Sequence, residues 1–344
     1  MKPLFSICIP NFNYATYMDI TLSSLKSQTV DNFEVLIADN ASTDHSVEII
    51  KKHKENGLPI QYVINPTNIG FAGNLDKVGV LSKAPWMIML SSDDVVNTNA
   101  LEVYSRFISL KGYDKNYAFC STFEKIDSEG KFLEFLSPAK SSIWFKSDID
   151  AELTMQMGFD VYKVKAGEML RRCLTRFLNP FNFASTCYPK EVYEKVGGYG
   201  GGRLYNPDKW FHWKIMAELD DVYYLDNPLF QYRWHNSNQT SQQNTNQALK
   251  YWVDEYINSF EISDVILYKS GINRANIADF FINRCIIPSA YRSARNNNLK
   301  LASRILNFGR ACYPNSSKIP KYYLLLILVK MPLISKFIFS VKVR

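Results

Sequence analysis

The stretch Trp86–Asp94, which reads W-M-I-M-L-S-S-D-D, constrains the fold of this chain more than any other. Its five largely apolar residues predict a buried strand, and a polar tip with two adjacent carboxylates follows at once. In an open α/β sheet, ligands bind beyond the carboxyl ends of the strands. Two acids there favour a hard divalent cation, which can in turn hold a diphosphate. The alternative is an acidic pair that caps a helix beginning near Ala100.

Strands and helices alternate along the first 110 residues. The apolar runs predict strands over residues 4–10, 33–38, 60–64 and 86–90, and amphipathic segments between them predict helices over residues 17–27, 47–50 and 75–81. This alternation predicts an α/β fold with a mostly parallel, doubly wound sheet flanked by helices. Polar clusters follow the first, second and fourth strands, which places all three on one rim of the sheet.

The sequence contains neither a G-x-G-x-x-G motif after the first strand nor a G-x-x-x-x-G-K-[ST] motif. Phosphate binding at a glycine-rich helix N-terminus is therefore not indicated. A protein without that cradle can hold a diphosphate through a divalent metal, which favours a functional reading of Asp93 and Asp94.

Length and composition indicate the class of protein. The 344 residues, 47% of them hydrophobic, predict a folded protein with one larger domain and an attached one. The six cysteines form no C-x-x-C pair, which argues against a zinc module or a disulfide scaffold and favours a reducing compartment. No basic segment followed by a long apolar one opens the chain, so we expect no cleaved signal peptide and a cytoplasmic protein.

The charge is concentrated at the C-terminal end. Residues 280–344 hold twelve Lys or Arg and no acid, so the net charge of +7 leaves the first 279 residues at 7 − 12 = −5.

From residue 241 the chain is predicted to be helical. The apolar run Tyr322–Val329 between Lys321 and Lys330 is too short for a bilayer, which needs about 20 residues. A short apolar run among lysines is typical of a helix lying on an anionic membrane, and docking on the protein's own core is the alternative. No recognisable module supports nucleic-acid binding.

The motifs of the first 110 residues resemble a known family. They are S-I-C-I-P-N-F-N, A-D-N-A-S-T-D, N-P-T-N-I-G-F-A-G-N and L-S-S-D-D. In this order and spacing they resemble the nucleotide-binding half of family-2 inverting glycosyltransferases of the GT-A fold, of the type that builds bacterial surface glycans.

The resemblance implies roles for individual residues of the donor site. Asp39 would read the nucleobase, Asp93 would lie near the ribose, and Asp94 would bind Mn²⁺ or Mg²⁺. The tip of the first strand would line the base and ribose pocket with Pro10, Asn11 and Asn13. The expected donor-binding set also includes Asn68, Gly70 and Asn74. Two departures weaken the match: Ser91 stands where many members have a further acid, and no Arg near Gly73 is present to meet the diphosphate.

Residues 111–240 are expected to form the acceptor half. Runs at 117–123 and 131–135 around D-S-E-G predict a hairpin, residues 137–180 predict a helical insertion, and 181–188 predict a further strand. A run of five glycines in six residues then precedes Asp208 at a predicted helix start. In the resembling family the acid at this place is the catalytic base, and a helix cap is the alternative role for Asp208.

The segment Tyr232–His235 reads Y-R-W-H and matches a Y-R-x-H segment that closes the catalytic domain in similar enzymes. The resemblance implies that His235 lies near the metal and that Arg233 meets phosphate oxygens. A structural role is the alternative for a single histidine. His212, on an aromatic helix face, is expected to be a packing residue.

These observations predict a metal-dependent inverting glycosyltransferase. The donor would be a nucleotide-diphosphate sugar, with UDP or dTDP favoured. The acceptor would be a hydroxyl of a glycan or a polyprenyl-linked substrate at the inner face of the cell membrane. The sequence leaves the oligomeric state open, including a homo-oligomer. One rival is a sugar nucleotidyltransferase, although the first-strand tip lacks the glycine-rich basic loop it would need. The other rival is an inactive nucleotide-binding subunit of a glycan-assembly complex.

Overall fold

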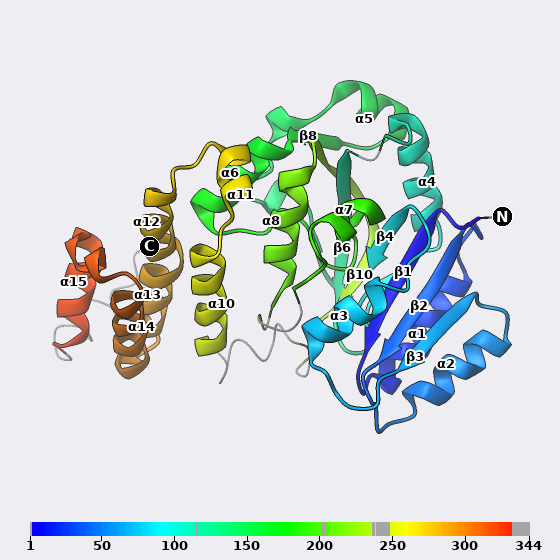
Figure 1. Cartoon of the computed structure of the whole chain (residues 1–344), viewed down its shortest axis with the longest axis horizontal. Coiled ribbons are helices and arrows are strands. Elements are labelled where there is room, and N and C mark those ends of the chain that lie inside the picture. The colour runs from blue at the N-terminus through cyan, green and yellow to red at the C-terminus, as the bar shows by residue number, and fades with distance from the viewer. Residues whose placement is uncertain are drawn as a thin grey trace. The chain divides into compact units, whose positions relative to one another are not determined.

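The computed structural model describes residues 2–114, 116–200, 204, 206–235, 238 and 248–331. The chain divides into two compact units (Figure 1). The first comprises Met1–Leu170 and Asn179–Asn246, and the second comprises Arg171–Leu178 and Gln247–Arg344.

A ten-stranded sheet forms the centre of the first unit, in the order β3-β2-β1-β4-β9-β6-β10-β5, with β7 beside β6 and β8 beside β10. The strands are β1 (Phe5–Asn11), β2 (Phe33–Asp39), β3 (Ile60–Ile64), β4 (Trp86–Met89), β5 (Val95–Val96), β6 (Tyr117–Ile126), β7 (Phe132–Leu136), β8 (Val161–Lys165), β9 (Cys187–Pro189) and β10 (Asp221–Arg233). Strands β3, β2, β1 and β4 are parallel, and β6 is parallel to β10. The other pairings are antiparallel. The expected α/β class is therefore confirmed, with parallel pairing in the N-terminal half and a mixed remainder.

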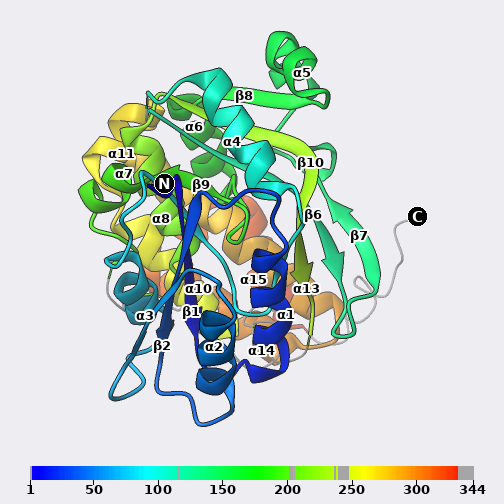
Figure 2. The ribbon, with the colours of Figure 1, turned by 90° about the vertical axis from the view of Figure 1, so that its right-hand side faces the viewer.

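Both faces of β1, β2 and β4 are covered, which explains why the sequences of these strands are largely apolar. Alternate side chains of β1, namely Phe5, Ile7 and Ile9, belong to one core cluster with buried residues of α1, α2 and α4. Buried residues of α3 lie outside that cluster, and α3 packs on β1 and β2 from the opposite face (Figure 2). These helices are α1 (Ala15–Lys26), α2 (Ser46–Glu55), α3 (Phe71–Gly79) and α4 (Ala100–Lys111).

The segment expected to be a helical insertion contains a strand. Helices α5 (Ala151–Met157) and α6 (Ala166–Arg176) flank β8, which pairs with Asp221–Leu225 of β10. In the sequence V-Y-K-V-K, Val161, Tyr162 and Val164 are buried while Lys165 is exposed, so residues on both faces of this strand are covered. The expected helical insertion over residues 137–180 therefore contains helices together with one strand that joins the sheet.

The strand expected over residues 181–188 is shorter than predicted. Only Cys187–Pro189 pairs with the sheet, because polar side chains before it bond to backbone groups. Asn182 donates from Nδ2 to the carbonyl of Ser121 over 3.0 Å, and the Ser185 hydroxyl donates to the same carbonyl over 3.2 Å. The first unit is completed by α7 (Lys190–Lys195) and α8 (Asp208–Glu218).

The second unit is helical among its described residues. Its helices are α10 (Ala248–Phe260), α11 (Asp264–Ser270), α12 (Ile277–Phe281), α13 (Ile287–Arg295), α14 (Leu299–Cys312) and α15 (Pro320–Val329). A π-helical turn, Ile282–Ile286, joins α12 to α13 at Pro288, which has no N–H to donate to the preceding turn. Helix α14 lies close to this turn at Gly309, where a Cβ atom would come within 2.8 Å of Ile286.

Helix α15 has one buried and one exposed apolar face. Its packed face contacts α13 and α14 through Tyr322, Leu325, Leu326 and Val329. Tyr323 and Leu324 are 54% and 59% exposed, and Ile327 is also exposed. One face of this run thus docks on its own unit, as one alternative expected, and the other face is exposed. Across the described helices, none has the length and apolarity that a membrane crossing requires.

Candidate active site

The carboxyl ends of β1 and β2 are joined by two buried side chains. Asn11 ends β1 and donates from Nδ2 to Oδ2 of Asp39, which ends β2, over 2.7 Å. The other Asp39 oxygen accepts the backbone N–H of Ser42 over 2.9 Å. Asn13 adopts a left-handed φ of 58°, and its Oδ1 accepts the backbone N–H of Thr43 over 2.8 Å. The two polar tips therefore form one preformed surface, which is what binding a rigid nucleoside requires.

Asparagines hold the neighbouring turn, and only Asn68 and Asn74 among them were expected from the sequence. Asn40 donates to Oδ1 of Asn68 over 2.9 Å, and Asn65 donates to Oδ1 of Asn74 over 2.9 Å. Asn74 in turn donates to the carbonyl of Ala38 over 2.8 Å. Asn68 Oδ1 also accepts the N–H of Gly70, whose φ is 79°. The expected donor residues Asn68, Gly70 and Asn74 thus shape the rim through contacts with Asn40 and Asn65.

The acidic pair lies beside the tip of β1 and does not cap a helix. Asn99 precedes the first residue of α4, and β5 separates it from the acids. The hydroxyl of Thr21 on α1 donates to the carbonyls of Ser92 and Asp94 over 3.1 and 2.8 Å. The Ser92 hydroxyl donates to the carbonyl of Pro10 over 3.4 Å. The acids are therefore fixed against α1 and β1.

The end of β10 meets the acidic pair from a distant part of the sequence. The backbone N–H of Arg233 donates to Asp94 Oδ1 over 3.0 Å, and His235 Nε2 lies 2.9 Å from Asp93 Oδ2. The Arg233 guanidinium is directed toward main-chain carbonyls: Nε donates to Asp93 over 3.0 Å, and Nη1 donates to Asp127 and Ser128 over 3.3 and 3.4 Å. In this state Arg233 therefore joins the acidic loop to the hairpin between β6 and β7.

Burial, followed by the charge of Asp93, raises the pKa of Asp94 well above its ordinary value. Burial and both acids likewise raise the pKa of the Tyr14 hydroxyl. A divalent cation would relieve the repulsion between the two carboxylates, and carboxylate oxygens with an imidazole suit Mn²⁺ or Mg²⁺. The donor chemistry of Asp93, Asp94 and His235 thus fits such an ion. No ready cluster of three or more His, Cys, Asp or Glu side chains is found among the described residues, so binding would require His235 to exchange its contact with Asp93.

Asp208 belongs to a second hydrogen-bonded group. It is the first residue of α8 and is partly exposed. Its Oδ2 accepts a hydrogen bond from Asn179 Nδ2 over 3.0 Å, and Asn179 Oδ1 lies 2.8 Å from His212 Nδ1. Burial raises the pKa of Asp208, against lowering contributions from Lys209 and from Asn179. A partly exposed carboxylate with a raised pKa has the properties of a general base.

The glycine-rich turn before Asp208 is anchored at its start. Gly198 has a φ of 60°, and a Cβ atom there would lie 2.5 Å from Asp76 Oδ1 on α3. Asp76 Oδ1 accepts the backbone N–H of Tyr199 over 2.6 Å, and Lys214 on α8 donates to the carbonyl of Val196 over 3.0 Å. Gly201 and Gly202 of the glycine run lie outside the described residues.

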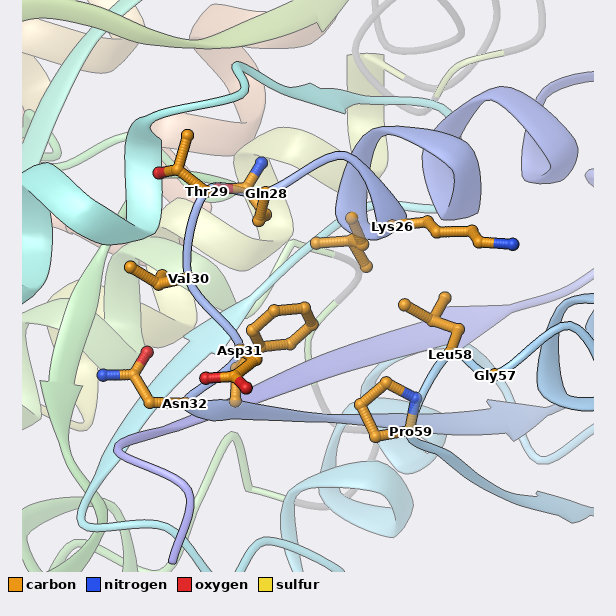
Figure 3. Close-up of a pocket in the computed structure, with 11 residues that line it drawn as sticks. Lys26, Gln28, Thr29, Val30, Asp31, Asn32, Gly57, Leu58 and Pro59 are labelled. Atoms are coloured by element: carbon orange, nitrogen blue, oxygen red, sulfur yellow. The ribbon is translucent and has the colours of Figure 1, made fainter. Parts of the chain in front are cut away.

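A cavity of about 630 Å³ lies at the opposite rim of the sheet, among residues that precede β2 and β3 (Figure 3). Lys26, Gln28, Asp31 and Pro59 are among the residues that surround it. The Gln28 amide is engaged, because Nε2 donates to Ser24 and Asn97 carbonyls over 3.1 and 3.0 Å. This cavity is not part of the candidate site at the carboxyl ends of the strands.

The structure therefore brings the expected donor residues into two connected sets and leaves Asp208 with partners of its own. The first set contains Asn11 and Asp39, and the second contains Asp93, Asp94, Arg233 and His235. His212 is fully buried, which confirms its expected packing role, but it also contacts Asn179. Sequence reasoning missed Asn179, because it lies in a segment without a motif, 29 residues before Asp208.

Comparisons with known proteins identify a family for part of the chain. Residues 6–166 match the family described as "Glycosyl transferase family 2". An uncharacterized glycosyltransferase of Haemophilus influenzae is 29% identical over 141 residues, which cover 40% of this chain and 54% of that protein. Glycosyltransferase GlyG of Streptococcus pneumoniae is 23% identical over 286 residues, which cover 82% of this chain and 87% of GlyG. The first-ranked curated relatives are thus matched over about half of their length or less.

The fold is similar to that of a solved structure. The crystal structure of TarS 1–349 of S. aureus in complex with UDP-GlcNAc superposes with a TM-score of 0.64 at 14% sequence identity. The superposition covers all of this chain and 93% of that one. At this identity the likeness concerns the fold alone.

Proposed function

Residues 6–166 of this chain belong to glycosyl transferase family 2, and from that premise we propose that the protein transfers a sugar from a nucleotide-diphosphate donor to a hydroxyl acceptor. The observation that carries the proposal is that the Asn11–Asp39 pair and the Asp93–Asp94 pair both lie at or just beyond the carboxyl ends of the neighbouring parallel strands β1, β2 and β4. The strand order reverses between β1 and β4, and ligands of open α/β sheets bind at such a switch point.

Residues 1–110 would hold the donor. Asp39, with Pro10, Asn11 and Asn13, would bind the nucleoside, and Asp93 would approach the ribose. The turn shaped by Asn68, Gly70 and Asn74 would border the sugar nucleotide. Asp94 and His235 would hold Mn²⁺ or Mg²⁺, which when bound neutralises charge on the diphosphate leaving group. Arg233 would need to leave its carbonyl partners to meet a phosphate, so we assign it first to positioning the acidic loop.

Residues 111–240 would bind the acceptor, and Asp208 would act there as general base. Its carboxylate takes the proton of the acceptor hydroxyl while the hydroxyl oxygen forms a bond to the anomeric carbon. The bond from that carbon to the diphosphate oxygen breaks on the opposite face, so the configuration inverts and the nucleoside diphosphate leaves. This arrangement requires Asp208 to be deprotonated, so turnover should increase as the pH rises through its raised pKa.

The proposed donor site is tested by calorimetric titration of the full chain. UDP, dTDP, GDP and CDP are titrated separately, each with Mn²⁺ and with EDTA. We expect one nucleotide to bind in a metal-dependent manner. UDP is titrated first, because the TarS structure holds UDP-GlcNAc. Sugars on the base so identified are then screened for release of the nucleoside diphosphate. If no nucleotide binds in the presence of Mn²⁺ or Mg²⁺, the proposal is wrong.

We further propose that residues 241–344 hold the enzyme at an anionic membrane surface, where a polyprenyl-linked or other glycan acceptor would be met. Residues 280–331 carry nine Lys or Arg and no acid. Lys321 and Lys330 flank the exposed face of α15 formed by Tyr323, Leu324 and Ile327. Apolar side chains among cations match the chemistry of an anionic lipid interface.

Vesicle flotation tests this membrane contact. We expect binding to vesicles that contain phosphatidylglycerol and little binding to phosphatidylcholine alone, because each basic side chain near an anionic surface contributes about 1 kcal/mol. Replacing Leu324 and Ile327 together by Asp should weaken binding by about tenfold or more. Val80→Asp, at a site on α3's C-terminal end that is 71% exposed, is the matched control. Equal binding of the double variant and the control would contradict the proposal.

A further inference from the structure

The side chain of Asn179 lies between the proposed base and a buried histidine. Its Nδ2 donates to Asp208 Oδ2 over 3.0 Å, and its Oδ1 lies 2.8 Å from Nδ1 of His212. We propose that Asn179 is a positioning residue that holds the Asp208 carboxylate for proton transfer, and that His212 fixes the orientation of the Asn179 amide. This inference rests on the proposed function of Asp208 as the base.

The protonation state of His212 determines which way the amide of Asn179 faces. His212 is fully buried, and its Nε2 has no hydrogen-bond partner within the described structure. Burial lowers the pKa of His212 to about 3, so the ring is neutral and carries one proton. Because Nε2 meets no acceptor, the favoured tautomer places that proton on Nδ1, where Asn179 Oδ1 accepts it. The amide is then oriented with its N–H₂ group toward Asp208.

The residues that follow Asn179 hold its segment in place, and the backbone N–H of Phe181 also donates to Asn179 Oδ1 over 3.4 Å. The carbonyl of Pro180 accepts the indole N–H of Trp144 over 3.0 Å, and Asn182 donates to the carbonyl of Ser121 on β6 over 3.0 Å. The ring of Phe181 packs edge-on against His212, with 5.3 Å between ring centroids. Asn179 thus starts from a fixed place. A hydrogen bond from the fixed side would restrict the rotamers of the carboxylate.

The ionisable groups around Asp208 leave room for this hydrogen bond to change the pKa of Asp208 measurably. Lys209, its neighbour in sequence, favours the ionised carboxylate, and burial opposes ionisation. Burial raises the pKa of Tyr199, so that ring stays neutral, and His212 is neutral as well. Removing the Asn179 donor should therefore raise the pKa of Asp208 further, since a donated hydrogen bond stabilises the ionised form.

The test measures the ionisation of Asp208 directly in the full-length protein. Aspartate labelled with ¹³C at the carboxyl carbon is titrated by NMR, and the Asp208 signal is assigned by its loss in Asp208→Asn. We expect a higher pKa for Asp208 in Asn179→Ala and a still higher one in Asn179→Asp, which keeps the shape but replaces the donor by a like charge. His212→Leu should raise the pKa of Asp208 less than Asn179→Ala does, because the backbone N–H of Phe181 still donates to Asn179 Oδ1. His212→Asn, which retains a donor near the position of Nδ1, should stay close to the parent.

Turnover gives the second measurement. Release of nucleoside diphosphate by Asn179→Ala should fall by about 10- to 100-fold at low pH, the range expected for a hydrogen bond to a charged group. The acid limb of the kcat profile should move to higher pH, with KM for the nucleotide sugar unchanged. If the foldable Asn179 variants leave both the Asp208 titration and the acid limb in place while Asp208→Asn is inactive, Asn179 is only structural. If Asp208→Asn itself keeps full turnover, the proposed base is wrong, which is a separate failure.

Discussion

Replacing Asp208 by Asn is expected to lower the turnover of the nucleotide sugar by about 10²- to 10⁴-fold, because the amide cannot accept the proton of the acceptor hydroxyl. The substitution preserves the size of the side chain and can turn its oxygen toward Asn179, so the local hydrogen bond is retained. Nucleotide affinity measured by calorimetry should stay unchanged, since Asp208 lies in a hydrogen-bonded group of its own. The loss should appear in kcat above the raised pKa of Asp208 and become smaller below it, where the parent carboxylate is itself protonated.

Asp264→Asn is the matched control for this experiment. Asp264 is likewise the first residue of a helix, α11, and its side chain is 93% exposed in an ion pair with Arg274. An exposed pair of this kind contributes little to stability, so the control should retain parent turnover. Full activity of Asp208→Asn would show that Asp208 serves the N-terminal end of α8 and not the chemistry.

Asp94→Asn is expected to weaken metal-dependent nucleotide binding by about 100-fold or more, because a ligand charge is removed from the proposed cation site. Asn is the informative replacement, because its Oδ1 can still accept the backbone N–H of Arg233. That buried N–H is therefore not left without an acceptor. Calorimetry with Mn²⁺ and with EDTA measures the effect. In the parent protein, metal-dependent affinity should also decrease as the pH falls through the raised pKa of Asp94.

The same substitution should stabilise the metal-free protein. Burial and the charge of Asp93 raise the pKa of Asp94, so the ionised carboxylate destabilises the fold at neutral pH, and the neutral amide removes that penalty. The midpoint of thermal unfolding in EDTA should increase by roughly 2–4 °C for each kcal/mol relieved. Asp226→Asn is the control, because Asp226 likewise accepts a hydrogen bond, from the Thr122 hydroxyl on β6. A drop in both stability and affinity for Asp94→Asn would indicate a structural acid and contradict the metal site.

Tests of Asp94 and Asp208 together separate the proposed enzyme from an inactive nucleotide-binding subunit. Such a subunit would lose nucleotide binding in Asp94→Asn but would show no turnover in the parent. An enzyme would show turnover that depends on both residues, with binding dependent only on Asp94.

Local sequence patterns were sufficient for the N-terminal half of the fold. Strands β2 and β3 and the hairpin of β6 and β7 lie close to the predicted ranges, because alternation, helical periodicity and turn residues act within a few positions along the chain. The carboxyl ends of parallel strands necessarily meet on one rim, so the proximity of Asn11, Asp39 and Asp93 also followed from the sequence. The strand β8 was missed because only its pairing with β10 distinguishes V-Y-K-V-K from part of a helix.

The remaining features of the site were decided by tertiary structure alone. Strand β10 shifts its register on β6 twice, between Leu225 and Phe230, and this irregularity sets which of its last residues reach the acidic pair. A shift of one residue turns side chains to the other face of a sheet, so no local pattern could specify that the N–H of Arg233 meets Asp94 or that His235 meets Asp93. The contact of Asn179 with Asp208 likewise depends on where two separate segments are packed. The sequence alone thus determined which residues can carry the chemistry, and the packing of distant strands and helices decided which of them hold one another in place.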